Sequence, residues 1–105
     1  MEYRQEKSIE GYFCEQVKRI GGYAMKITSP GMAGVPDRLV LFNGVAVFVE
    51  LKAPSKEPKS RQKAVHRFLY RLGFPVSVID SKEMVDRFVQ EVERRGIIVE
   101  GGDAE

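Results

Sequence analysis

The sequence predicts an α/β fold in which a mixed β-sheet with a central hairpin is flanked by helices on both faces. Three observations support this prediction. Helix-like and strand-like segments follow in the order helix, strand, hairpin, helix, strand, helix. Asn43-Gly44 stands between two apolar runs and is typical of a two-residue hairpin turn. Both faces of that hairpin are apolar, so other layers should cover each of them.

The remaining elements follow from hydrophobic periodicity and from residues that begin or end helices. The expected elements are a helix at 6–20, a strand at 23–28, a loop at 29–36, the hairpin at 37–50, a helix at 60–72, a strand of central type at 75–79 and a helix at 81–95. The expected N-caps are Ser60 and Ser81. Residues 97–99 suggest either a short added strand or a partner contact, and the Gly-rich, acidic residues 100–105 suggest a disordered tail.

The hairpin turn fixes a register with a chemical consequence. If Asn43-Gly44 is the turn, Asp37 lies opposite Glu50 on one face, and Lys52 points to the same face. Two like charges directly opposite each other destabilise a sheet, so a divalent cation such as Mg²⁺ or Mn²⁺ is one reason to keep them. Lys52 would then suit an anionic, phosphate-containing substrate. The alternative is a hairpin end at which the acids extend into water and Lys52 pairs with one of them.

The residues around this pair carry a family resemblance. Gly34-Val35-Pro36-Asp37-Arg38 and Phe48-Val49-Glu50-Leu51-Lys52 resemble the signature of the PD-(D/E)XK nuclease superfamily, and in particular its virus-type replication-repair nuclease (VRR-NUC) family. The resemblance covers about residues 6–89 and implies a restriction-endonuclease-like core. It also implies metal-dependent hydrolysis of DNA, with Asp37, Glu50 and the Leu51 carbonyl as ligands of Mg²⁺ or Mn²⁺. Lys52 would orient the attacking water or stabilise charge on the phosphate.

The resemblance implies further site residues on other elements. An acid of the first helix joins the metal site in this superfamily, and Glu10 fits that place better than Glu6 because Glu10 borders the apolar stripe of the helix. Lys26 is either a phosphate-facing cation or an ordinary edge-strand lysine. Gln62, near the start of the second helix, is either close to the site or simply exposed. His66, one turn later, is expected to be solvated or capping rather than a general base.

Charge and composition bear on the domain organisation, the cellular location and the binding partner. The 105 residues fit one domain at 1–99, with no apolar run long enough for a membrane span and no signal peptide at the charged N-terminus. A single cysteine excludes an internal disulfide and favours a cytoplasmic location, in a bacterial or phage-infected cell. A basic segment is expected either to bind DNA or to form an ordinary solvated face; its cations are Lys56, Lys59, Arg61 and Lys63.

The family resemblance implies a homodimeric DNA endonuclease that acts on branched DNA, such as four-way junctions, and needs no small-molecule cofactor. Small relatives resemble junction resolvases, which pair to cut both strands. Two other classes stay open: a nuclease-like module that binds nucleic acid without cutting it, and a structural subunit that depends on a separate catalytic partner. The intact Asp37, Glu50 and Lys52 argue against the binding module.

Overall fold

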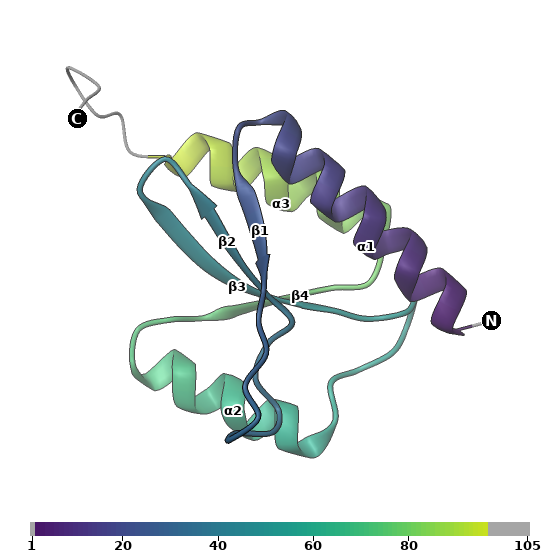
Figure 1. Cartoon of the computed structure of the whole chain (residues 1–105), viewed down its shortest axis with the longest axis vertical. Coiled ribbons are helices and arrows are strands. Elements are labelled where there is room, and N and C mark those ends of the chain that lie inside the picture. The colour runs from purple at the N-terminus through teal and green to yellow at the C-terminus, as the bar shows by residue number, and fades with distance from the viewer. Residues whose placement is uncertain (1, 97–105) are drawn as a thin grey trace.

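The computed structural model describes residues 2–96 and confirms the α/β fold class (Figure 1). The elements are α1 Glu2–Arg19, β1 Tyr23–Lys26, β2 Arg38–Phe42, β3 Val45–Leu51, α2 Ser60–Arg71, β4 Val76–Ile79 and α3 Lys82–Arg95. Within the described residues, the strands form one sheet in the order β1-β2-β3-β4. β4 runs parallel to β3, and the other neighbours are antiparallel. α1 and α3 pack together on one face, and α2 lies on the other.

The hairpin register is the one that the sequence predicts. Asn43 and Gly44 have φ values of 45° and 83°, as a type I′ turn requires. Arg38 pairs with Val49, and the next pairs toward the turn follow in step to Phe42 and Val45. The extrapolated register therefore sets Asp37, one residue before β2, opposite Glu50.

The main core lies between the sheet and the α1–α3 layer. Val40, Val49 and Leu51 of the sheet are buried there. The buried residues that α1, β4 and α3 contribute are Ile9, Phe13, Val17, Ile79, Val85 and Val89. The rings of Phe13 and Phe88 join the two helices at a centroid distance of 5.6 Å. Truncating a fully buried phenylalanine such as Phe13 to alanine typically costs about 3–5 kcal/mol, so this layer carries much of the stability.

The opposite layer differs from the prediction, because α2 covers less of the sheet than expected. Val65 of α2 is buried, but Phe68 and Leu72, which helical spacing places on the same face as Val65, are 46% and 57% exposed. α2 packs against β4 at one edge, so Leu41 on β2 is also partly open at 37%. Helices thus cover both faces of the sheet as predicted, but α2 leaves the hairpin partly open at Leu41.

Several boundaries also differ. α1 begins at Glu2 rather than at residue 6, and β1 ends at Lys26 rather than at residue 28. β4 is an edge strand of the described sheet, not a central one. Ser60 is the first helical residue of α2 and not its cap; the preceding Lys59 N–H donates to the side chain of Gln62 over 2.8 Å. Ser81 caps α3 as predicted, because its hydroxyl accepts a hydrogen bond from the Met84 N–H.

The predictions for residues 97–99 and 100–105 fall outside the described residues. In the part of the chain that is described, the helices are too short or too polar to cross a membrane.

Candidate active site

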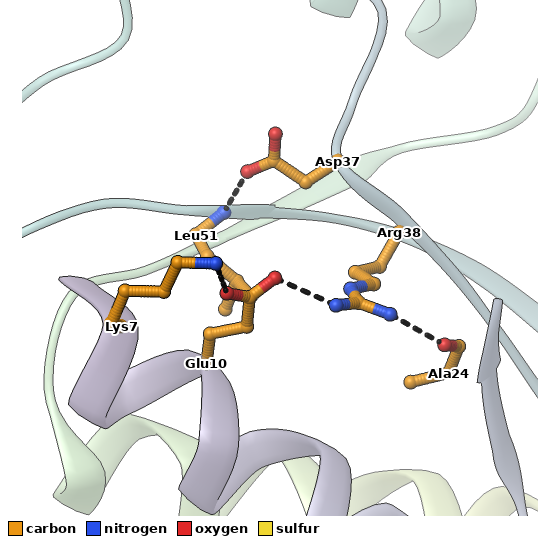
Figure 2. Close-up of polar contacts among 6 residues, drawn as sticks. All are labelled: Lys7, Glu10, Ala24, Asp37, Arg38 and Leu51. Atoms are coloured by element: carbon orange, nitrogen blue, oxygen red, sulfur yellow. Dashed lines mark hydrogen bonds and ion pairs between the residues drawn. The ribbon is translucent and has the colours of Figure 1, made fainter. Parts of the chain in front are cut away.

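The Asp37–Glu50 pair sits where β2 begins and β3 ends. Glu50 is only 1% exposed, an unusual degree of burial for a carboxylate. Asp37 is half-buried, and its Oδ2 accepts a hydrogen bond of 2.9 Å from the Leu51 N–H (Figure 2). This bond holds the Asp37 side chain beside β3, next to Glu50. The alternative in which both acids extend into water does not fit the burial of Glu50.

A close approach of backbone to backbone fixes the loop that leads to Asp37. Gly34 has φ = 91°, a left-handed conformation that side chains disfavour. A Cβ atom at Gly34 would lie 2.9 Å from the backbone oxygen of Arg61 in α2. The loop after β1 therefore packs directly on the first turn of α2, which ties Asp37 to the helix that carries Gln62.

Lys52 and Gln62 hold the Glu50 carboxylate. The Lys52 ammonium lies 3.3 Å from Glu50 Oε2 and donates to Gln62 Oε1 over 2.9 Å. Gln62 Nε2 in turn donates to Glu50 Oε2 over 2.7 Å. Because the amide oxygen receives Lys52 and the amide nitrogen meets a carboxylate, the orientation of Gln62 follows from its partners. Of the two alternatives for Gln62, near the site or simply exposed, these contacts favour the first.

Asp37 and Glu50 are not easily both ionised at this site. Burial, and then the negative charge of Asp37, raise the pKa of Glu50 from its ordinary 4.5 to about 7, although Lys52 opposes the shift. Such a pKa for a carboxyl group is typical of functional sites.

The pair offers a place for a hard cation. Glu50 Oε1 is buried and has no hydrogen-bond partner among the described residues, which is costly unless another group meets it. No three acidic, histidine or cysteine side chains within the described range gather closely enough to hold a metal by themselves. Mg²⁺, however, is usually bound by one or two carboxylates together with water and substrate phosphate. Asp37 and Glu50 supply that number, with oxygen donors that suit Mg²⁺ or Mn²⁺.

The two acids of α1 have different surroundings. Glu10 accepts a 2.6 Å charged hydrogen bond from Arg38 and lies 3.3 Å from Lys7, and the bond from Arg38 lowers its pKa (Figure 2). The pKa of Glu6 is raised, first by partial burial and then by the charge of Asp37, whereas Lys52 lowers it. The sequence favours Glu10 as the third site acid. In the structure, however, Glu10 is bonded to Arg38, and Glu6 is the α1 acid whose pKa the Asp37 carboxylate raises.

Arg38 lies on the side of the sheet away from the acidic pair, as alternation along β2 requires. In Figure 2 the Asp37 carboxylate and the Arg38–Glu10 pair lie on opposite sides of the β3 ribbon. Arg38 also donates to the Ala24 carbonyl over 3.0 Å, so it links α1, β1 and β2. A cavity of about 240 Å³ adjoins this link and reaches Asp37; it is lined by Glu6, Lys7, Glu10, Lys26, Asp37 and Arg38. Lys26 thus lines the same cavity as Asp37, and it pairs with Arg38 across β1 and β2.

The predicted DNA-binding cations lie on the segment before α2 and on its first turn, the turn that also carries Gln62. All are exposed: Lys56, Lys59, Arg61 and Lys63. Lys63 forms an exposed ion pair of 3.0 Å with Glu57, which is weak enough to exchange for a phosphate.

Comparisons with known proteins agree with this geometry. No family model matches the sequence. The chain is 48% identical over 81 residues to a protein described as "Putative nuclease p44" of Acyrthosiphon pisum secondary endosymbiont phage 1, covering 76% of this chain and 87% of the relative. A solved structure described as "VRR_NUC domain" superposes with a TM-score of 0.75 at 32% identity, covering 82% of this chain and 95% of that one. The chain therefore belongs to the VRR-NUC family of nucleases.

Proposed function

We propose that this nuclease is a Mg²⁺- or Mn²⁺-dependent DNA endonuclease that hydrolyses phosphodiester bonds at the Asp37–Glu50 pair. The observation that carries the proposal is the burial of Glu50, with Oε1 unpartnered while Lys52 and Gln62 hold Oε2. A buried carboxylate opposed by another acid and open at one oxygen suits a cation better than it suits a structural role.

Each residue has a defined task in this proposal. Asp37, Glu50 and the Leu51 carbonyl would hold the cation. When bound, the cation polarises the phosphate and lowers the pKa of water. Lys52 presents its ammonium where negative charge develops on the phosphate oxygens. The water oxygen would form a bond to phosphorus and lose one proton to solvent, the bond from phosphorus to one sugar oxygen would break, and that oxygen would take up a proton and leave as an alcohol.

Glu6 is the better candidate for the α1 acid, and Glu10 has a structural task. Glu6 lies in the field of Asp37 and Lys52, whereas Glu10 is engaged by Arg38. We therefore expect Glu6→Gln to lower cleavage without destabilising the fold. Glu10→Gln should lower stability more, because it leaves the part-buried Arg38 without its carboxylate partner.

Branched DNA is the proposed substrate, and a symmetric homodimer is the proposed active form. The exposed cations around the start of α2 suit the phosphate backbone, and two copies would offer two sites to a symmetric junction. The open apolar residues Leu41, Phe68 and Leu72 suit burial against a second copy. We place the activity in the cytoplasm of a bacterial or phage-infected cell, in DNA replication, recombination or repair.

The test of substrate choice is a cleavage panel. Labelled four-way junction, flap, nicked and linear DNA are incubated with the protein in Mg²⁺, Mn²⁺ or EDTA. Faster cutting of the four-way junction, at paired positions on opposite strands, supports the proposal. Equal cutting of all four substrates would refute the structure selectivity but not the nuclease activity. Light scattering that shows a monomer at high micromolar concentration would refute the dimer.

A further inference from the structure

α2 faces the acidic pair with two polar side chains. Gln62 and His66 are one helical turn apart and therefore share a face of the helix. Gln62 has partners at both amide atoms: its nitrogen donates to Glu50, and its oxygen accepts from Lys52 and from the Lys59 N–H. His66 extends the same face by one turn, and neither the proposed reaction nor the core packing uses its imidazole.

The imidazole of His66 has an unmet hydrogen-bonding group. Within the described residues, the buried side-chain atoms without a partner are Arg38 Nε, Glu50 Oε1 and His66 Nε2. Arg38 is held through its other nitrogens, and Glu50 Oε1 is the atom that the proposed cation would meet. His66 Nε2 is thus the buried atom that still lacks an explanation. Leaving such an atom unsatisfied is costly, so a partner is expected in the working state of the site.

The position of His66, one turn after the glutamine that accepts a hydrogen bond from Lys52, points to Lys52 as that partner. Burial lowers the pKa of His66, the positive charge of Lys52 lowers it further, and Asp37 opposes the effect. The imidazole is therefore neutral near pH 7, with one ring nitrogen free to accept a hydrogen bond. Lys52 is the cation whose charge lowers the pKa of His66. Its ammonium carries hydrogen-bond donors and no acceptor.

Lys52 has a donor to spare. Its ammonium has three N–H groups, and the structure pairs it with Gln62 Oε1 at 2.9 Å and Glu50 Oε2 at 3.3 Å. If the Glu50 oxygens turn toward a cation, Lys52 loses its carboxylate partner. It would then be held by Gln62 alone, which is too little to fix a long and flexible side chain.

We propose that His66 is a positioning residue for Lys52, and that its Nε2 accepts a hydrogen bond from the Lys52 ammonium once Glu50 turns to the cation. Gln62 Oε1 and His66 Nε2 would then form a pair of acceptors on one face of α2. They would hold the ammonium toward the scissile phosphate. This inference rests on the proposed role of Lys52 in DNA hydrolysis.

Two amide substitutions test the proposal, because they differ only in reach. The amide of glutamine reaches about as far as Nε2, whereas the amide of asparagine reaches about as far as Nδ1. His66→Gln should keep kcat within a few-fold of the wild type. His66→Asn and His66→Phe should lower kcat by about tenfold or more, the size expected for one hydrogen bond to a charged group, with little change in KM. Equal activity of all three variants and the wild type, or rescue by asparagine but not by glutamine, would overturn the proposal.

A spectroscopic measurement tests the hydrogen bond without any cleavage. His66 is the only histidine in the sequence, so tag-free, ¹⁵N-labelled protein gives one imidazole in NMR spectra. With Mg²⁺ present, the proton should reside on Nδ1, and the Nε2 resonance should shift in Lys52→Met. A proton on Nε2, or an Nε2 resonance that does not change in Lys52→Met, would overturn the inference. A wild type that never cuts DNA would refute the proposed function, and these spectra would still decide whether His66 and Lys52 meet.

Discussion

Replacing Glu50 with glutamine should remove a pH-dependent loss of stability from the metal-free protein. Glu50 is 1% exposed, and burial together with Asp37 raises its pKa from 4.5 to about 7. The difference between these two pKa values corresponds to about 3 kcal/mol of folding free energy that is lost when Glu50 ionises. Glutamine keeps the shape of the side chain but has no proton to lose.

The direction of the effect follows from proton binding. Below the unfolded pKa of 4.5, Glu50 is protonated in both states and costs nothing. Between 4.5 and about 7, the unfolded chain releases its proton first, so the folded state binds more protons and stability falls as pH rises. Above about 7 the loss is complete and constant. The stability of Glu50→Gln should lack this fall.

Urea unfolding in EDTA measures the difference. Between about pH 5 and about pH 8, the unfolding free energy of Glu50→Gln minus that of the wild type should grow by as much as about 3 kcal/mol. Glu57→Gln, at a side chain 79% exposed, is the matched control and should show almost no change with pH. A difference that is constant with pH would refute the raised pKa. If instead the wild type becomes more stable relative to Glu50→Gln as pH rises, the attraction of Lys52, and not burial, dominates the electrostatics of Glu50.

Three further predictions concern the cation, the loop and the DNA surface. Asp37→Asn should abolish cleavage and lose most of the Mn²⁺-induced rise in Tm expected of the wild type, because a cation that binds only the folded state stabilises it by mass action; a full rise in the variant would exclude Asp37 as a ligand. Gly34→Ala should lower the unfolding free energy by about 1–3 kcal/mol in urea titrations, because its Cβ would meet the Arg61 backbone at a positive φ. Gly31→Ala, which meets open space, should change it by less than about 0.5 kcal/mol, and equal effects would contradict the close approach. Reversing the charges of Arg61 and Lys63 should flatten the salt dependence of DNA binding by roughly 0.9 in log–log slope for each phosphate that is no longer neutralised, and an unchanged slope would leave them as ordinary solvated cations.

The sequence was informative where local geometry decides the outcome. Asn43-Gly44 allows essentially one tight turn, and side chains alternate along strands, so the turn alone fixes the register up to Arg38 and Val49. The opposition of Asp37 and Glu50 follows from that register. The family resemblance left Gln62 either near the site or simply exposed, and its hydrogen bonds join it to Glu50 and Lys52.

The sequence was less informative where distance along or between elements decides the outcome. Helical periodicity shows which face of α1 Glu6 and Glu10 share, but not how far along the sheet each one reaches. In the structure Glu10 accepts a hydrogen bond from Arg38, and the position of Arg38 depends on the pairing of β1 with β2. Likewise, the apolar stripe of α2 predicts an inward face, yet Phe68 is 46% exposed and lines an open hollow with residues of the loop after β1, such as Met32.

The central claim is that the Asp37–Glu50 pair cuts DNA with a divalent cation, and one cleavage assay tests it most directly. Wild type, Glu50→Gln and Lys52→Met are incubated with one labelled branched DNA in Mn²⁺ and in EDTA, and binding is measured on the same samples. We expect cleavage by the wild type in Mn²⁺ alone, and binding without cleavage by both variants. Cleavage in EDTA, or by Glu50→Gln, would contradict the site assignment, and a wild type that binds but never cuts would make the protein a binding module.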